Sequence, residues 1–469
     1  MIGESGRMKT QTPLQSFSGV VPSLAQIADF GPPRSEIGIG CLMPWNGKLY
    51  VLNYCSHRKS TGTGTGLRVI EGDFSMNQHP AAVDGTYANR FVHNASSQLI
   101  IGPHVIDTQH QVRTVEALVD VRLCGTANHL SEPERLVYML GMEGELFELD
   151  VHTLETKLIF DLTDELGTPG EGSCHFKDCY TGCGRLVVVN NDYHEPDFLG
   201  ERSEGTLAEF DGTAWRVIER KPFVGLAGLG IYGNTIFASG WDRASAILKV
   251  FTEGDKTWRT YRLPKASHCF DHKWQTEWPR IRAVEHERLL MDHHGMFYEL
   301  SPWAYGNRVW GIRPISTHLW VHGDFCSFKG LLVIGADNAS HESAGNVTSA
   351  EPQSGIWMGK TDDLWKLGKP KGWGGPWWKN QTEAGVPSDP YLMTGFDKKC
   401  LHLFHEEAGE VVFTVELDAL GDGTFKCWQT IKVGEGESAM LAFPDGLSAH
   451  WLRITSRTAC TATAQLHYT

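Results

Sequence analysis

The sequence predicts an all-β protein, a seven-bladed β-propeller followed by a small C-terminal β-rich, sandwich-like region. Three observations lead to this prediction. The chain has 469 residues, which is too long for one ordinary hydrophobic core. It contains 51 glycines and 16 tryptophans, a composition that suits many turns and broad, flat side chains. Short apolar runs with a period of two recur along the chain, whereas helical periodicity is almost absent.

The recurring unit is a strand-like run, a short turn and a second alternating run. Examples are KLYVLNY at 48–54, QLIIGPHVI at 98–106, RLVYMLGMEGELFELD at 135–150 and RLLMDHHGMFYEL at 288–300. We count seven such units at spacings of roughly 35 to 55 residues, the length of a propeller blade with four short strands. They predict a propeller over residues 30–365. An irregular pair of β-sandwiches is the alternative.

The rest of the chain differs in composition. Residues 366–389 are rich in Gly, Pro and Trp, and we expect a linker or capping loop there. Residues 390–469 return to strand-like alternation, in VVFTVELDAL, FKCWQTIKV and HWLRITS. This alternation predicts a C-terminal β-rich region of sandwich type.

Charge and hydropathy exclude some partners. The formal net charge is −14, which argues against a nucleic-acid partner because such a partner usually requires a basic face. No run of about 18 apolar residues is present, so we expect no membrane span. The N-terminal segment MIGESGRMKTQTPLQ has no apolar stretch typical of a signal peptide, so the sequence does not decide between an intracellular and a secreted protein.

Polar residues just before the first strand of each blade are expected to converge on one pocket at one end of the propeller axis. Three histidines at corresponding positions of blades two, three and four predict a shared site, although one such histidine alone is more often structural. The residues at these positions are Asn89, Arg90 and His93 in blade two, His129 in blade three, His175 and Lys177 in blade four, and Trp278 and Arg280 in blade six. Tyr193 and Arg220 also belong to blade four.

A pocket with His, Tyr and Arg but no matched pair of carboxylates is poorly suited to glycoside hydrolysis. No GxSxG, P-loop or HExxH motif supports acyl transfer, phosphoryl transfer or zinc proteolysis. The set suits β-elimination from a uronic acid. In that reaction an Arg neutralises the carboxylate, a His removes the C5 proton, and a Tyr or second His protonates the leaving oxygen.

A second group of soft ligands lies further along the chain, around SHCFDHKW. His268, His294 and Cys326 are of the types that bind zinc. Their spacing is irregular, and hydrogen-bonded histidines in a tight loop between blades are the alternative.

Several strings of the sequence resemble one family. They include ANRFVH, QLIIGPHVID, SGWDRASAILKV, YRLPKASH, TEWPRIR, GIRPISTHLWVHGDFC and FPDGLSAHWLRIT. Together they resemble the seven-bladed propeller polysaccharide lyases, over about residues 36–465. This group includes the ulvan lyases and the L-rhamnose-α-1,4-D-glucuronate lyases that act on gum arabic and arabinogalactan side chains.

The resemblance implies a secreted lyase that cleaves a rhamnose–glucuronate linkage by β-elimination, with an ulvan lyase as the alternative. Carried over by position, His93 or His129 would be the base, Tyr193 or a second His the acid, and Arg220 the group that neutralises the carboxylate. The segment EPDFLGERSEG beside Tyr193 departs from the family pattern.

In this family the chemistry needs no cofactor. Some relatives hold a structural metal, zinc or calcium, for which His268, His294 and Cys326 are the matching candidates here. The expected partner is a uronic-acid-containing polysaccharide or oligosaccharide.

Two hypotheses without catalysis remain. The protein could be a glycan-binding propeller, in which exposed aromatic side chains hold sugars without chemistry. The candidate platforms are Trp241, Trp278, Trp373, Trp377 and Trp378. It could also be a structural scaffold.

Overall fold

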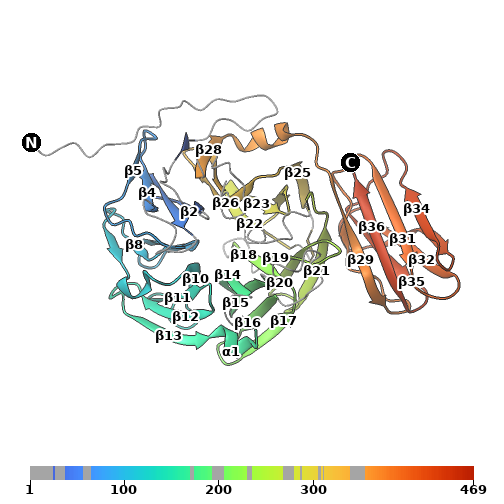
Figure 1. The fold of residues 1–469 in the computed structure, drawn as a ribbon, viewed down its shortest axis with the longest axis horizontal. Coiled ribbons are helices and arrows are strands. Elements are labelled where there is room, and N and C mark those ends of the chain that lie inside the picture. Colours follow the sequence, from blue (N-terminus) through green and yellow to red (C-terminus); the bar gives the residue numbers. More distant parts are fainter. Residues whose placement is uncertain are drawn as a thin grey trace, which may run out of the picture.

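The protein is an all-β molecule in which four-stranded sheets stand around a common axis, with a β-sandwich at one edge (Figure 1). The fold is that of a computed structural model, and the predicted all-β propeller is confirmed. The structure describes residues 25–26, 37–55, 65–168, 174–192, 205–229, 235–267, 279–285, 288–304, 308–309, 311–337 and 354–469.

Within these residues the propeller consists of groups of four antiparallel strands, which we number as blades 1 to 7. Blade 1 contains β2 (Ile37–Trp45), β3 (Lys48–Cys55), β4 (Gly66–Ile70) and β5 (Met76–Gln78). Blade 2 contains β6 (Arg90–His93), β7 (Gln98–Ile101), β8 (His104–Ile106) and β9 (Val112–Thr114). Blade 3 contains β10 (Leu123–Asn128), β11 (Leu136–Gly141), β12 (Glu145–Asp150) and β13 (Thr156–Asp161).

The remaining blades follow the same plan. Blade 4 contains β14 (Cys174–Gly182), β15 (Arg185–Asp192), β16 (Thr206–Phe210) and β17 (Trp215–Glu219). Blade 5 contains β18 (Phe223–Ala227), β19 (Thr235–Trp241), β20 (Ala246–Thr252) and β21 (Trp258–Leu263). Blade 6 contains β22 (Arg280–Glu285), β23 (Arg288–His293), β24 (Met296–Leu300) and β25 (Arg313–Thr317). Blade 7 contains β26 (Val321–Phe328), β27 (Leu331–Asp337), β28 (Ser354–Gly359) and the early strand β1 (Ala25–Gln26).

The order of the strands in blade 7 closes the ring. There β1 pairs with β28, so the start of the chain completes the last blade and leaves fewer open sheet edges. The first strands of neighbouring blades contact one another, which places them around the axis. They run from what we call the upper face of the propeller to its lower face, and the second strands run back.

Short turns with positive φ join consecutive strands within a blade. Asn46 and Gly47 have φ of 45° and 86° between β2 and β3. An Asn-Gly pair with both residues at positive φ is the preferred type of two-residue hairpin turn. His294 and Gly295 (φ 50° and 78°) make the same kind of turn between β23 and β24, and there the first position is a histidine.

Three short helical segments complete the described part of the propeller. They are η1 (Glu116–Leu118), α1 (Leu162–Leu166) and η6 (Thr361–Leu367). Asp161 caps α1 by accepting from the Thr163 amide, and Gly167 ends it in a left-handed conformation. None of the helices in the described part of the chain combines the length and the apolar character needed to cross a membrane.

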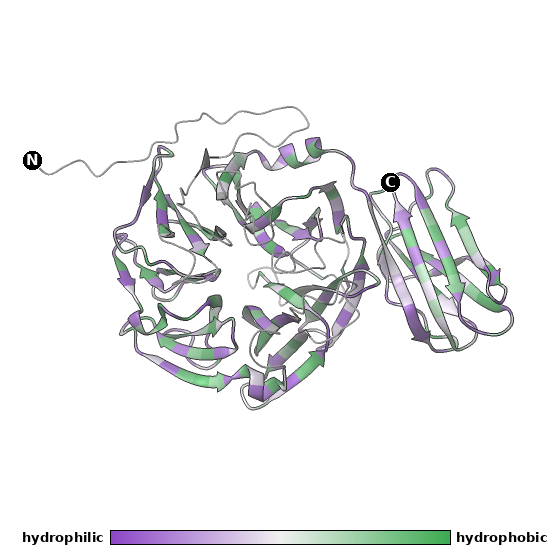
Figure 2. Cartoon of the chain, in the orientation of Figure 1, coloured by the Kyte–Doolittle hydropathy of each residue, from purple (hydrophilic) through white to green (hydrophobic). Residues whose placement is uncertain are grey.

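The hydrophobic core is divided among the spaces between blades. Separate clusters join blades 1 and 2, blades 3 and 4, blades 4 and 5, and blades 7 and 1. Figure 2 shows hydrophobic residues distributed through the strands of the blades, interspersed with hydrophilic ones. The second strands are nearly continuous apolar runs because both of their faces are covered by neighbouring blades.

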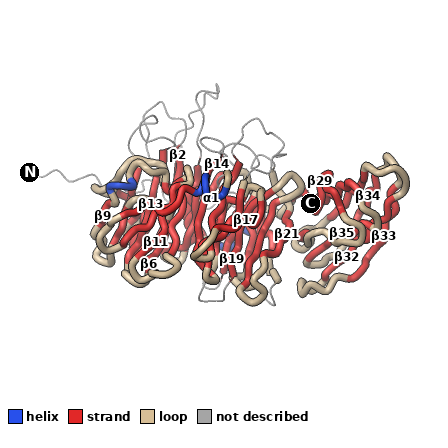
Figure 3. The backbone as a smooth tube through the Cα atoms, turned by 90° about the horizontal axis from the view of Figure 1, so that it is seen from below, coloured by secondary structure: helices blue, strands red, loops and turns tan. Residues whose placement is uncertain are grey.

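The C-terminal region is a β-sandwich (Figure 3). One sheet contains β29 (Gly372–Thr382), β36 (Cys460–Tyr468), β31 (Lys399–His405) and β34 (Ser438–Ala442). The other contains β30 (Tyr391–Leu392), β35 (Trp451–Ser456), β32 (Val411–Asp418) and β33 (Lys426–Val433). The second sheet continues the sheet of blade 5, because β30 pairs with β21 at Arg262 and Tyr391. A single hydrophobic cluster spans both regions.

The expectation of a linker at 366–389 is wrong, because this segment contains β29, a strand paired along its length with β36. Its glycines serve close packing and not flexibility. A Cβ atom on Gly375 would lie 1.9 Å from the carbonyl oxygen of Ala464. The Gly- and Trp-rich composition therefore led to the prediction of a linker where the structure has a strand.

Candidate functional site

The upper face of the propeller gathers buried polar side chains. The second strands run toward this face as apolar stretches and then end in polar residues: LYVLNY, RLVVVNND and RLLMDHH. The buried polar residues at these ends are Asn53, Asn190, Asn191, Asp292 and His293. Burying a polar group costs free energy unless it is hydrogen-bonded, so each of them needs a partner or a role.

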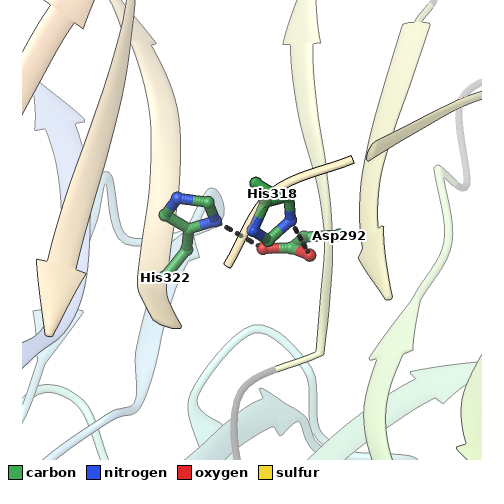
Figure 4. Close-up of side chains that lie close together, drawn as sticks. All are labelled: Asp292, His318 and His322. Atoms are coloured by element: carbon green, nitrogen blue, oxygen red, sulfur yellow. Dashed lines mark hydrogen bonds and ion pairs between the residues drawn. The ribbon is translucent and has the colours of Figure 1, made fainter. Parts of the chain in front are cut away.

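The densest group at this face consists of Asp292, His318 and His322, shown in Figure 4. Asp292 lies near the end of β23, His318 directly follows β25, and His322 lies near the start of β26. Asp292 Oδ1 is 2.9 Å from His318 Nε2, and Asp292 Oδ2 is 2.6 Å from His322 Nδ1. One carboxylate thus joins two imidazoles that come from two neighbouring blades.

The local fold holds the three side chains rigidly. The His318 amide donates to the carbonyl of Gly295, which fixes the chain after β25 against the β23–β24 turn. The Phe297 ring packs on both imidazoles, with ring centroids 4.5 Å from His318 and 5.1 Å from His322. Asp292 and His322 are only 5% and 3% exposed, so their interactions are poorly screened by water.

The hydrogen bonds assign different protonation states to the two imidazoles. His318 Nδ1 faces the carbonyl oxygen of Trp320 at 3.1 Å, while Nε2 faces the carboxylate of Asp292. Both partners are acceptors, and only an imidazolium donates from both nitrogens. His322 donates from Nδ1 to Asp292, so in its neutral form Nε2 keeps the lone pair.

Electrostatics agree with the neutral form of His322. Burial lowers the pKa of His322, and the neighbouring His318 lowers it further, so His322 is neutral at neutral pH. Burial alone would raise the pKa of Asp292, but the two histidines outweigh burial and hold that pKa well below its usual range. The cluster therefore combines a carboxylate, a cationic imidazole and a neutral imidazole, which is an acid beside a base.

Charged side chains also meet at the axis. Asp324 on β26 accepts from Arg282 Nε at 2.8 Å, from Arg90 Nε at 3.0 Å and from the Leu42 amide at 2.8 Å. Burial would raise the pKa of Asp324, but Arg282 and Arg90 lower it overall. This network ties blades 1, 2, 6 and 7 together. Arg280 acts electrostatically on the same aspartate, and its backbone pairs with Asp292, so this arginine links the axis to the three-residue cluster.

The three histidines predicted to share a pocket do not lie at the same end of the strands. His93 ends β6, and His129 follows β10, so both lie at the lower face. His175 lies near the start of β14, at the upper face. The prediction of a common register is wrong because it took the apolar second strands for the first strands of their blades.

Both lower-face histidines have their ring nitrogens engaged by the protein. His93 lies 2.6 Å from Ser96 Oγ through Nδ1 and 2.8 Å from the Pro133 carbonyl through Nε2. His129 Nδ1 accepts from the Glu132 amide at 3.0 Å, and its Nε2 lies 3.2 Å from Glu148. This geometry is that of turn-stabilising histidines and gives no support to either as a base.

The other predicted residues have varied positions. Arg220 follows the outermost strand of blade 4, where it is exposed and bonds to Thr206 and the Leu166 carbonyl, so it lies at the rim and not at the axis. Asn89 is buried and donates to Gly102 and Thr126 between blades 2 and 3. His175 Nε2 lies 3.2 Å from Arg122, and Lys177 is buried on β14.

The predicted aromatic platforms differ in their exposure to solvent. Trp241 is only 3% exposed and packs on His294, so it is not an open platform, and Trp377 is buried as well. Trp373 and Trp378 of the sandwich are part-exposed. Tyr193, Trp278 and His268 lie outside the described residues.

Two of the three predicted metal ligands, His294 and Cys326, lie in different surroundings, and His268 lies outside the described residues. Cys326 lies in the axial network beside Arg90 and Asp324, whereas His294 contacts His293 and Trp241. In the described part of the chain, the set that could hold a metal ion is Asp292, His318 and His322, whose ligand atoms lie within 4.8 Å of one another. Two imidazoles and a carboxylate suit a borderline ion such as zinc better than calcium, which prefers oxygen ligands.

Sequence reasoning missed Asp292, His318 and His322. The signal that could have found them is the polar ending of an apolar second strand, MDHH, together with HLWVH before the first strand of the next blade. Two histidines and an aspartate at the same end of adjacent strands are brought together by the blade geometry.

Comparisons with known proteins give the fold and no family. No protein-family model matches the chain, and no curated protein matches it. One similar structure is a luciferin-regenerating enzyme, with a TM-score of 0.37 and 10% identity, covering 69% of this chain and 91% of that one. Another is the β-propeller domain of Cps50 (Swd1) from Myceliophteria thermophila, with a TM-score of 0.41 and 9% identity, covering 71% and 99%. These likenesses give no information on activity, and the chain stands as a β-propeller protein.

Proposed function

We propose that this protein is a polysaccharide lyase that cleaves a rhamnose–glucuronate type linkage by β-elimination at the uronic acid. The observation that carries the proposal is the cluster at the upper face, where one buried carboxylate holds a cationic and a neutral imidazole 2.9 and 2.6 Å away. The sequence resemblance to propeller lyases supplies the substrate class, gum arabic or arabinogalactan side chains.

In the proposed reaction His322 is the base. Its Nε2 takes the proton from C5 of the uronate, and the electron pair forms the C4–C5 double bond as the C4–O4 bond breaks. The departing oxygen takes the place of Asp292 Oδ1 at His318 Nε2, and His318, as the imidazolium, gives it that proton. Asp292 orients both rings, and an acid held beside a base is what concerted acid–base catalysis requires.

Arg280 is the proposed partner of the substrate carboxylate. It begins β22 and its backbone pairs with Asp292, so the two side chains emerge on the same side of the sheet. Carboxylate neutralisation makes the C5 proton more acidic, and a guanidinium offers a planar, bidentate contact for it. Arg280 replaces Arg220 in this role because Arg220 lies at the rim.

The test is incubation of the full chain with gum arabic while the ultraviolet absorbance of an unsaturated uronate is followed. We expect the rate to fall about 10²- to 10⁴-fold for His322→Ala and for His318→Ala, the usual contribution of a general base or acid. Arg280→Lys should cost roughly 10- to 10³-fold, because lysine lacks the planar fork.

The matched control is His152→Gln, which alters an exposed histidine in the β12–β13 turn and should keep the wild-type rate. Circular dichroism should show that every variant is folded. A His322→Ala protein with undiminished product formation would refute the assignment of the base. Substrate binding without any product would indicate the glycan-binding alternative.

A hydrolase is the second candidate, on one observation. Asp178 and Asp324 both lie near Arg282, and burial raises the pKa of Asp178 while Asp324 has a lowered pKa. Such a pair could serve as acid and base. Both carboxylates are occupied by backbone amides, however, Asp178 by Leu226 and Cys179 and Asp324 by Leu42. Release of saturated sugar without the ultraviolet signal would favour the hydrolase.

A further inference from the structure

A second concave site lies far from the upper-face cluster, at the outer part of blade 1 where blade 2 covers it. This hollow, which we call the rim pocket, has a volume of about 180 Å³. Its lining includes Lys48, Tyr50, Val69, Glu71, Asn77, His79 and His110. At about 30 Å³ for each water molecule of the liquid, it has room for roughly six waters, or for one small ring.

The register of the blade explains how the pocket forms. Tyr50 on β3 is opposite Val69 on β4, and Val69 is opposite Asn77 on β5, so these three side chains share one face of the sheet. Lys48 lies two residues before Tyr50 on β3 and therefore projects from the same face. Glu71 follows the end of β4 and His79 follows the end of β5, and both line the pocket. His110 reaches over this face from the β8–β9 turn of blade 2, with φ of 65°.

Two imidazole N–H groups in the pocket are fixed by their neighbours. Burial, Glu71 and Asp107 raise the pKa of Tyr50 to about 12, so its hydroxyl keeps its proton, and this hydroxyl lies 3.0 Å from His110 Nδ1. The Ala81 amide donates to His79 Nδ1 at 3.1 Å. Neutral His79 must therefore carry its proton on Nε2, and His110 does so when the Tyr50 hydroxyl is the donor. Within the described residues, neither Nε2 has a hydrogen-bond partner.

The pocket has balanced charge. Lys48 Nζ and Glu71 Oε1 form an ion pair of 3.1 Å. Burial lowers the pKa of both His79 and His110, and Lys48 lowers both further, so the two rings are neutral at neutral pH. An anionic ligand would have to approach Glu71, and a cationic ligand Lys48. The lining therefore favours a neutral ligand that both donates and accepts hydrogen bonds.

We propose that the rim pocket binds one neutral sugar ring. A sugar hydroxyl is both donor and acceptor, and neighbouring hydroxyls can bridge an amide, an ion pair and an N–H donor at once. Asn77, the Lys48–Glu71 pair and the Nε2 atoms of His79 and His110 supply these partners, and Val69 gives an apolar contact. The site is separate from the proposed chemistry and would hold a neighbouring part of a glycan or a free monosaccharide.

The experiment is saturation-transfer difference NMR on the full chain with D-glucose, D-galactose and L-rhamnose, and with D-glucuronate as the charged comparison. We expect transfer to at least one neutral sugar, with a dissociation constant on the order of millimolar for a ligand of this size. His79→Ala should weaken binding roughly three- to tenfold, because one hydrogen bond is lost. Asn77→Ala is the second variant, in case His79→Ala does not fold.

Two controls separate this pocket from the rest of the protein. His152→Gln and His322→Ala should both bind the sugar like the wild type. The proposal is overturned if no neutral sugar shows transfer, or if folded His79→Ala and Asn77→Ala bind the neutral sugars unchanged. Loss of the signal in His322→Ala would place the sugar at the upper face and also refute the proposal.

Discussion

Replacing Asp292 by asparagine removes the charge of this residue while keeping the size and shape of its side chain. Asparagine offers one oxygen and one NH2 group where aspartate offers two oxygens. The oxygen can accept from His322 Nδ1, and the NH2 group can donate to His318 Nε2 if His318 gives up its extra proton. The Trp320 carbonyl still accepts from His318 Nδ1. The variant thus keeps every hydrogen bond but contains no charge.

The free energy of unfolding should respond differently to two substitutions at this position. Asp292→Asn removes both charges of the buried pair together, a change that is often nearly neutral, and we expect a loss under about 2 kcal/mol. Asp292→Ala leaves the His318 cation buried without its carboxylate, which should cost about 3–5 kcal/mol. The rate of product formation should respond differently from stability. Asp292→Asn lacks the imidazolium acid and should lose about 10²- to 10⁴-fold in rate, although its fold is little destabilised.

The dependence on pH provides a further check. The folded pKa of Asp292 lies below its unfolded value, so its contribution to stability is present above about pH 3.9 and disappears as the pH falls through the folded pKa. The wild type should therefore approach Asp292→Asn in stability as the solution is acidified.

The assay is urea denaturation followed by tryptophan fluorescence, beside the rate of unsaturated product formation. Equal destabilisation by Asp292→Asn and Asp292→Ala would refute the protonation states assigned to the cluster. If the purified wild type contains zinc and Asp292→Asn does not, the three residues are metal ligands instead of an acid–base pair.

Three further predictions concern stability. Asp324→Asn should lower the free energy of unfolding by about 3–5 kcal/mol in urea denaturation, because Arg90 and Arg282 lose their buried anionic partner. The control Glu410→Gln, at an exposed ion pair, should cost under about 1 kcal/mol. Similar values for both variants would contradict the axial network. Arg262→Ala removes the bonds from Arg262 to Asp242 and Asp389 and should expose the sandwich to limited proteolysis, so unchanged resistance would argue against this link. Burial lowers the pKa of His104 to about 4, so on acidification the unfolded chain binds a proton at this histidine before the folded protein does. About 3 kcal/mol of the free energy of unfolding should therefore be lost between pH 6.5 and 4. His104→Gln should make the free energy of unfolding less dependent on pH in this range.

The fold could be predicted because its pattern is local. The second and third strands of a blade form hairpins with clear apolar alternation, as in β11 and β12, and their spacing is regular. The propeller and the strands after residue 390 follow from that pattern. The strand β29 did not, since Gly375 and Trp377 serve tight packing against β36 and leave no simple alternation.

The site could not be predicted in the same way, because the first strands are irregular. Most carry a bulge near the axis, between Ile39 and Cys41 in β2, between Phe176 and Asp178 in β14, and between His322 and Asp324 in β26. A bulge breaks the period of two and turns side chains toward the axis. Sequence reasoning therefore passed over the first strands and placed His93 and His129 at the wrong end of the propeller.

The hydrogen-bond status of the buried polar groups distinguishes the two faces. At the lower face, His93 and His129 have both ring nitrogens within hydrogen-bond distance of protein partners, so folding alone accounts for them. At the upper face, Asn190 is fully buried, and neither atom of its amide finds a partner in the described part of the chain. An apolar residue there would avoid a cost of about 1–3 kcal/mol. Stability therefore does not explain Asn190, and we place the chemistry at the upper face, where Asp292 also lies.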